Sequence, residues 1–266
     1  MISHLVLAGG RATRLFGPQG GCKPLLQLGD GTVLMDYCIH ECGDIPVGER
    51  IVIVSDETNG PIQHHLLRSE PVPRILTQRA TGTGPAVAAL MGATCADSVL
   101  LTTSDIAGRS GALRSFYRGS LARLQEQSGP ICLVAVGPTA PEEDSPIYVH
   151  YDYSGRVHAY GKGIEPSVRS FASARVLNGE FRDAYLKHWE PSLTDTQTMT
   201  KVLTSLPGSI VAVEVDAIFD VDEIQSLKRA RALKAVDRLG HAARQDRWVR
   251  PDQLPEVGNR GRGEDA

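Results

Sequence analysis

The first 25 residues hold glycine, arginine and lysine side chains whose types and spacing suit the binding of a polyphosphate. The apolar run 5–7 predicts a short buried strand. Gly9 and Gly10 follow it and allow the chain to turn tightly against a ligand. Two glycines alone are more typical of an ordinary turn, but here three cations follow: Arg11, Arg14 and Lys23. Backbone N–H groups combined with fixed cations favour a ligand that carries several phosphates.

A second candidate binding segment spans residues 78–90, where a glutamine and a Gly-Thr turn precede an alanine-rich stretch. The Gln78 side chain has both a donor and an acceptor, so it can bind the edge of a nucleobase. Small residues let the predicted helix and its N-terminal amides come close to a flat ligand. A loop followed by an ordinary capped helix is the alternative interpretation of this segment taken alone.

Carboxylates occur in two further segments. Residues 98–104 predict a strand that ends at Asp105, and ligands of open α/β sheets bind at the carboxyl ends of such strands. Asp220 and Asp222 alternate late in the chain, and an extended backbone would direct both to the same side. Because an aspartate after a strand often caps the next helix, capping remains open for Asp105 and for one member of the later pair.

The elements that must position these residues alternate between strands and helices along the chain. Further strands are expected at 50–55, 74–76, 131–136, 147–151, 156–160, 168–176 and 210–215, and helices at 32–42, 59–69, 111–127, 181–189, 195–206 and from 223 through 233. This alternation predicts a three-layer α/β/α fold with a mainly parallel sheet and helices on both faces. Residues 1–236 are expected to form one domain, and 237–266 a disordered or loosely packed tail.

The composition limits the partners and the location of the protein. The 266 residues carry a formal net charge of −3, which gives no general reason to expect nucleic acid or an anionic membrane as a partner. No apolar run has transmembrane length, and no basic-then-apolar leader precedes the first strand, so a cytoplasmic location is expected. The five cysteines form no C-x-x-C pair, which argues against a disulfide framework or a structural zinc site.

LAGGRATRL followed by KPLL resembles the G-x-x-T-R-[LM]…K-P signature of the nucleotidyltransferase superfamily, which includes sugar-phosphate and MobA-like NTP transferases. QRATGTGPA is similar to the Q-x-x-x-G-T-x-x-A base-binding segment of that superfamily. DVDEIQS resembles its D-[IV]-[DN]-T-x-x-D-L segment, although Glu223 and Ser226 replace the usual Thr and second Asp. Ser104 likewise replaces the glycine that often precedes the first metal-binding aspartate. The resemblance covers roughly 2–235 and implies a Rossmann-like sheet of the nucleotide-diphospho-sugar transferase type.

The resemblance also implies roles for individual residues. The implied nucleotide-binding residues are Leu7, Ala8, Gly9, Gly10, Arg11, Thr13, Arg14, Lys23, Gln78, Gly82, Thr83 and Ser104. The implied catalytic residues are Arg14, Lys23 and Lys162. Lys162 would reach the substrate's phosphate, but an exposed turn lysine is an equally good interpretation. The implied Mg²⁺ ligands are Asp105, Asp220 and Asp222, with Asp220 favoured over Asp222 as the second carboxylate.

The implied reaction is Mg²⁺-dependent transfer of a nucleotidyl group from a nucleoside triphosphate to a phosphorylated small molecule, such as a sugar 1-phosphate or a phosphonate, with release of pyrophosphate. A glycosyltransferase of the same fold is one alternative, but such enzymes usually carry Asp-x-Asp where this chain has Thr103-Ser104-Asp105. A catalytically weak nucleotide-binding protein is another, favoured by the departures in the last two motifs. The sequence leaves the nucleotide, the acceptor and the oligomeric state open.

Overall fold

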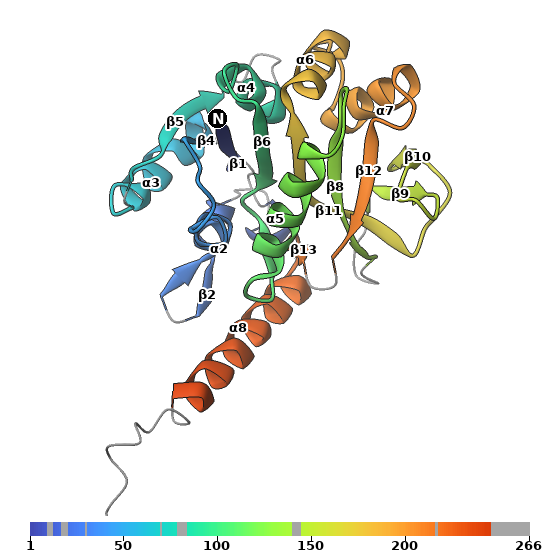
Figure 1. The fold of residues 1–266 in the computed structure, drawn as a ribbon. Coiled ribbons are helices and arrows are strands. Elements are labelled where there is room, and N and C mark those ends of the chain that lie inside the picture. The colour runs from blue at the N-terminus through green and yellow to red at the C-terminus, as the bar shows by residue number, and fades with distance from the viewer. Residues whose placement is uncertain are drawn as a thin grey trace, which may run out of the picture.

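The computed structural model describes residues 1–9, 13–16, 21–29, 31–69, 71–78, 84–139, 145–215 and 218–245. Within these ranges the centre of the molecule is a nine-stranded sheet with helices on both faces (Figure 1). The strands run β10-β9-β11-β6-β1-β4-β5, and β8 and β12 continue from β11. The predicted α/β fold with a mainly parallel sheet is therefore confirmed.

One half of the sheet is parallel and brings several strand ends to the same edge. Its strands are β1 (Ile2–Leu7), β4 (Glu49–Ser55), β5 (Arg74–Gln78) and β6 (Ser98–Thr103). Leu7 lies opposite Ile53 on β4 and opposite Thr103 on β6. Ser55 lies opposite Gln78. Parallel strands have their carboxyl ends at one edge of a sheet. Gly9, Gln78 and Asp105 therefore all lie at or just beyond the same edge.

The other half is mixed. Strand β11 (Arg169–Asn178) runs antiparallel between β6 and β8 (Cys132–Pro138), while β12 (Ile210–Glu214) is parallel to β8. The expected hairpin consists of β9 (Tyr148–Tyr151) and β10 (Val157–Gly161), and it joins the sheet where Tyr148 pairs with Ser170 of β11. Antiparallel β11 therefore separates the two parallel groups of strands.

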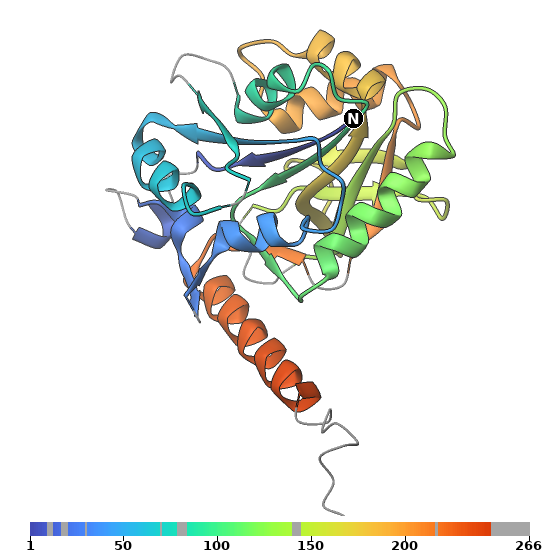
Figure 2. The ribbon, with the colours of Figure 1, turned by 60° about the vertical axis from the view of Figure 1, so that its left-hand side comes forward.

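Side chains alternate between the two faces of the sheet, as the two-residue period of a strand requires. Leu5 packs on the face covered by α4 (Pro85–Gly92), α6 (Gly179–His188) and α7 (Asp195–Ser205). The opposite face is covered by α2 (Leu34–His40), α3 (Asp56–Leu66) and α5 (Ala112–Gln125). Val6, one residue after Leu5, packs on this second face. The three layers are seen edge-on in Figure 2.

Two short two-stranded sheets lie outside the main sheet. Strand β7 (Ile106–Gly108) pairs antiparallel with β13 (Ile218–Asp220), and β2 (Gln27–Gly29) pairs with β3 (Thr32–Val33). The short elements α1 (Thr13–Phe16) and a 3₁₀ turn (Lys23–Leu25) flank the glycine-rich region. The sequence did not predict β7, whose three residues are too few to show a strand pattern.

The last helix, α8 (Ile224–Gln245), begins against these small sheets and projects away from the body of the molecule (Figures 1 and 2). Leu227, Ala230 and Leu233 pack on this side of the protein. The helix continues beyond its expected end at Leu233, because no proline interrupts the following residues and most of them are good helix formers. The domain boundary at 236 stays a prediction.

The beginning of α2 also differs from the prediction. The helix begins at Leu34 rather than Thr32, because Thr32 belongs to β3. The Asp36 carboxylate accepts the Val33 N–H at 2.9 Å and so replaces the expected threonine cap.

No helix in the described part of the chain is both long enough and apolar enough to cross a membrane.

Candidate active site

A hollow of about 250 Å³ at the carboxyl edge of the parallel strands gathers residues from four separate segments of the chain. Its lining consists of Leu7, Gly9, Lys23, Pro24, Gln78, Thr103, Ser104 and Asp105. Six of these were predicted site residues, and the other two, Pro24 and Thr103, are their direct neighbours in the chain. Ala8 N donates to Ile53 O at 2.7 Å, and Ser104 N donates to Leu7 O at 2.9 Å. These bonds extend the strand pairing up to the wall of the hollow.

Gly9 lies closely against the ends of β4 and β5. A Cβ atom at this position would lie 3.4 Å from Ser55 N and 3.6 Å from Gln78 Oε1. The first distance is at the edge of ordinary van der Waals contact, so a side chain beyond Cβ would have to occupy the space beside Gln78. The absence of a side chain at Gly9 therefore keeps the backbone near Gln78 accessible.

Lys23 places a buried ammonium group between two carboxylates. Its Nζ donates to Asp105 Oδ2 at 2.7 Å and also to Asp222 Oδ1, and only 6% of the side chain is exposed. Burial by itself lowers the pKa of Lys23, but attraction to Asp105 and Asp222 outweighs burial and raises this pKa above its usual value. The side chain is therefore a permanent cation at the floor of the site.

The β7–β13 pairing brings the late carboxylate Asp220 to the end of β6. Asp220 lies opposite Ile106, and Val221 N donates to Asp105 O at 2.8 Å. One oxygen of the half-buried Asp220 carboxylate, Oδ2, accepts the Ser173 hydroxyl at 2.8 Å. Burial, followed by the negative charges of Asp105 and Asp222, raises the pKa of Asp220 well above its usual value.

The donor atoms at this position suit a hard divalent cation. Asp105 Oδ1 and Asp220 Oδ1 are buried and, among the described residues, have no hydrogen-bond partner. The described part of the chain contains no group of three or more His, Cys, Asp or Glu side chains that could hold a metal ion as they stand. Mg²⁺, however, is usually held by one or two carboxylates together with substrate phosphates and water. Two carboxylate oxygens that have no partner in the described structure, beside the hollow lined by Lys23 and Gly9, fit that pattern.

Asp222 has different surroundings from Asp220. Its side chain is 39% exposed, and besides Lys23 it contacts Arg14, with 3.4 Å between Arg14 Nη1 and Asp222 Oδ2. A different side chain bonds to the backbone at the start of α8: Ser226 Oγ accepts the Glu223 N–H at 3.0 Å. Asp222 is thus the member of the pair that contacts both Arg14 and Lys23.

A comparison with models of protein families finds a match. The family model of the MobA-like NTP transferase domain matches residues 4–175. The chain belongs to this family. Its function is accordingly of the nucleotidyltransferase type. A search of curated protein sequences found no match to the chain.

Two solved structures share the fold of this transferase domain. A protein assigned as a glucose-1-phosphate thymidylyltransferase from Bacillus anthracis, in complex with sucrose, superposes with a TM-score of 0.72 at 16% identity, covering 88% of this chain and 95% of the other. The inositol-1-phosphate CTP transferase from T. maritima gives a TM-score of 0.67 at 15% identity, covering 90% and 96%. At these identities the likeness shows a common fold alone.

Some predicted residues of the transferase domain lie apart from this cluster or outside the described residues. Lys162 is exposed and directly follows β10. The preceding residue, Gly161, pairs with Tyr148 of β9, and Tyr148 in turn pairs with Ser170 of β11. In the described structure Lys162 makes no ion pair with the three aspartates. Thr13 begins α1. Four predicted residues lie outside the described ranges: Gly10, Arg11, Gly82 and Thr83.

The sequence analysis missed Ser173, which contacts Asp220 directly. Its position depends on an irregularity in β11, where the register with β8 shifts between Phe171 and Arg175. A strand pattern carries no signal for such a shift, so Ser173 reads as one more residue of an ordinary strand. Only the pairing of β11 with its neighbours reveals that the hydroxyl faces Asp220.

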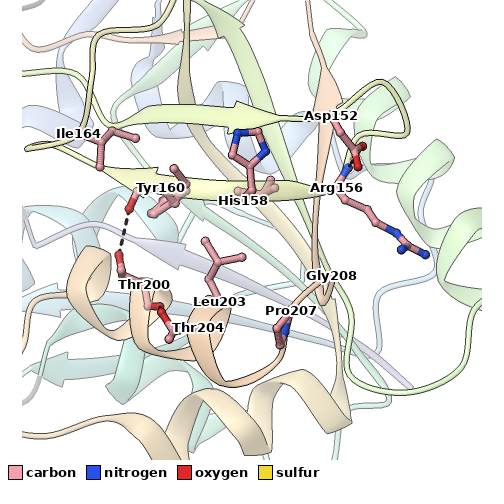
Figure 3. A pocket seen from close by; sticks show the side chains of 12 residues that line it. Asp152, Arg156, His158, Tyr160, Ile164, Thr200, Leu203, Thr204, Pro207 and Gly208 are labelled. Atoms are coloured by element: carbon pink, nitrogen blue, oxygen red, sulfur yellow. Dashed lines mark hydrogen bonds between the residues drawn. The ribbon is translucent and has the colours of Figure 1, made fainter.

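A larger hollow, of about 580 Å³, lies between β10 and α7 (Figure 3). Its lining in the described structure includes none of the predicted site residues. The threonines of α7 that face it already have partners, since Thr200 Oγ1 donates to Tyr160 O at 3.0 Å and Thr204 Oγ1 donates to Thr200 O at 2.9 Å. The smaller hollow, with a buried cation and carboxylates, is therefore the better candidate for the active site.

Proposed function

We propose that this domain transfers a nucleotidyl group from a nucleoside triphosphate to a phosphorylated small molecule, such as a sugar 1-phosphate or a phosphonate, and releases pyrophosphate. The observation that carries the proposal is the position of Lys23. Its buried ammonium binds Asp105 at the hollow that Gly9 and Gln78 also line. Lys23 supplies a fixed cation, Gly9 leaves the backbone without a covering side chain, and the Gln78 amide can bind a nucleobase. Together these groups suit the binding of a nucleoside triphosphate at this edge of the sheet.

The donor nucleotide would lie across the carboxyl ends of β1 and β5. Gln78 would contact the base, and the chain at Gly9 would face the phosphates. Lys23 and Arg14 would neutralise the leaving pyrophosphate, and Ser104 would border the nucleotide beside Asp105. This arrangement favours catalysis by positioning and charge neutralisation.

Asp105 and Asp220 would hold Mg²⁺ through the carboxylate oxygens that have no partner in the described structure. When bound, the ion would neutralise charge that develops on the reacting phosphates. Lys23 would then exchange its contacts with the carboxylates for contacts with phosphate oxygens. Asp222, which is more exposed, would keep Arg14 near the phosphates through their ion pair.

The acceptor phosphate needs little activation. A phosphate oxygen is already anionic at neutral pH, so the site requires no strong general base. Lys162 would contact the acceptor's phosphate from the end of the β9–β10 hairpin. An acceptor bound there would approach along the side of the sheet formed by β11.

A pyrophosphate-release assay tests the proposal. The purified protein is incubated with CTP, UTP, dTTP, GTP or ATP and a panel of phosphorylated acceptors, with and without Mg²⁺. Mg²⁺-dependent pyrophosphate release for one nucleotide–acceptor pair supports the proposal. Consumption of a nucleotide-sugar without pyrophosphate would indicate a glycosyltransferase. Nucleotide binding, seen as a thermal shift, without turnover of any acceptor would indicate a nucleotide-binding protein.

A further inference from the structure

Ser173 has a backbone conformation that is unusual for a residue with a side chain. Its φ angle is 51°, and no other non-glycine residue in the described ranges has a positive φ. The residue is buried within β11, at the place where the register of that strand shifts. Left-handed backbone is unfavourable for an L-residue and persists only where its surroundings impose it. A serine at a position that favours glycine indicates that its hydroxyl group has a role that glycine could not fill.

The side chain and the backbone of Ser173 contact two different parts of the candidate active site. Its hydroxyl donates to Asp220 Oδ2 at 2.8 Å. Its carbonyl accepts the Thr102 hydroxyl at 3.3 Å, and Thr102 lies on β6, three residues before Asp105. Ser173 thus connects β6, the strand that precedes Asp105, with the carboxylate of Asp220.

The hydrogen bond decides which oxygen of Asp220 stays available. The terminal torsion of an aspartate is broad, so packing alone does not fix the plane of the carboxylate. With Oδ2 held by Ser173, Oδ1 is the buried oxygen that has no partner in the described structure. Oδ1 of Asp105 is the other such oxygen at this site. One carboxylate oxygen on each side of the site therefore remains for a cation.

We propose that Ser173 is a positioning residue that orients the Asp220 carboxylate for binding of a divalent cation. This inference rests on the proposed function, because it assumes that Asp105 and Asp220 hold Mg²⁺. Groups that hydrogen-bond to metal ligands typically contribute 10- to 100-fold to metal affinity. We expect loss of the hydroxyl to weaken cation binding by about 10-fold or more.

The variants Ser173→Ala and Ser173→Gly separate this role from a purely structural one. Both remove the hydroxyl, but only glycine adopts the left-handed backbone without steric cost. The Tm of Ser173→Gly is therefore expected to exceed that of Ser173→Ala, while both variants lose the same cation affinity. Ser120→Ala, which removes another buried hydroxyl on α5, serves as the matched control. It should leave cation affinity unchanged.

The measurement is Mn²⁺ binding to the protein, followed by the loss of the free-ion EPR signal beyond the loss that the preferred nucleotide causes by itself. The Mg²⁺ dependence of the rate supplies a second readout, in which half-maximal activity should need about 10-fold more Mg²⁺ while kcat at saturating Mg²⁺ falls less. Wild-type affinity in both Ser173 variants, or affinity that follows Tm instead of the hydroxyl, overturns the positioning role and leaves the proposed function standing. A wild-type protein that binds no Mn²⁺ with any nucleotide overturns the metal-dependent function and the positioning role together.

Discussion

The backbone N–H of Val221 donates to the carbonyl of Asp105 at 2.8 Å. This bond joins the residue directly after β13 to a residue two positions beyond the end of β6, although the two segments are far apart in the chain. Asp220, one residue before Val221, is thereby placed near Asp105, whose negative charge helps to raise the Asp220 pKa. The same segment contributes Asp222 to the ion pair with Lys23. The candidate active site therefore depends on a contact between two three-residue strands.

Asp105→Asn is expected to abolish nearly all turnover while the protein stays folded. The amide keeps the shape of the side chain but removes a charge that both Lys23 and a divalent cation need. Pyrophosphate release, with far-UV circular dichroism as the test of folding, provides the measurement. A folded variant with the wild-type rate would remove Asp105 from the metal site.

The two late aspartates should respond differently to amide substitution. Asp220 is half-buried and has one buried oxygen without a partner in the described structure, whereas Asp222 is 39% exposed and paired with Lys23 and Arg14. Asp220→Asn should therefore raise the Mg²⁺ concentration for half-maximal rate by at least about 10-fold, and Asp222→Asn by much less. Mg²⁺ titrations of both variants measure this difference. A larger effect at Asp222 would reverse the assignment of the second ligand.

Lys23→Ala should lower kcat/KM by at least about 100-fold, because it removes a buried cation that faces the charge of the leaving pyrophosphate. Steady-state kinetics at saturating Mg²⁺ give the value. Lys201→Ala is the matched control, since Lys201 is an exposed lysine of α7 whose partner is Glu190. An unchanged kcat/KM for Lys23→Ala would argue against its contact with the phosphates.

The ion pair between Arg175 and Asp195 should contribute strongly to stability. Arg175 on β11 is 4% exposed, its Nη1 lies 3.1 Å from Asp195 Oδ1, and the same oxygen accepts the Tyr185 hydroxyl at 2.6 Å. Asp195→Asn leaves the guanidinium buried without its counter-charge, which is expected to cost about 3 kcal/mol of unfolding free energy. This figure is at the low end for buried pairs because 32% of the Asp195 side chain is exposed.

Urea unfolding of Asp195→Asn measures the loss. The exposed pair of Lys201 with Glu190 is the control, and Glu190→Gln should change the unfolding free energy by less than about 1 kcal/mol. Equal effects at the two positions would mean that burial does not strengthen the Arg175–Asp195 pair.

His4 should make the protein less stable as the pH falls. Burial, followed by repulsion from Arg50, lowers the pKa of His4 from 6.5 to about 3, and Arg50 Nε donates to His4 Nδ1 at 3.1 Å. Between these two pKa values the unfolded chain binds a proton that the folded protein does not. The contribution of His4 to the free energy of unfolding is therefore constant above about pH 6.5. Below that pH it falls by up to about 1.4 kcal/mol per pH unit.

The variant His4→Asn isolates this effect. Its amide oxygen can accept from Arg50 in place of Nδ1, but it does not titrate. The difference in unfolding free energy between wild type and variant, measured from pH 7.5 to 4.5, should be flat above pH 6.5 and should fall with a slope of about one proton below it. A constant difference over the whole range would show that His4 is not kept neutral by the fold.

The sequence predicted most of the fold because its signals are local. Apolar runs and turn residues located the strands of the main sheet, and the motifs placed the glycines, Gln78 and Asp105 after predicted strands. The family resemblance and the fold are confirmed by the comparisons and the structure. The roles of individual site residues, Lys162 among them, stay predictions.

Only the tertiary structure determined how the site is joined together. The pairing of β7 with β13, the contact of Lys23 with two aspartates and the hydrogen bond from Ser173 to Asp220 all link segments that are distant in the chain. None of them leaves a periodic pattern, because each depends on where strands end and where one register shifts. Local chemistry in the sequence therefore determined which residues bear charge and which elements form. Packing of the strands against one another determined which of those charges meet.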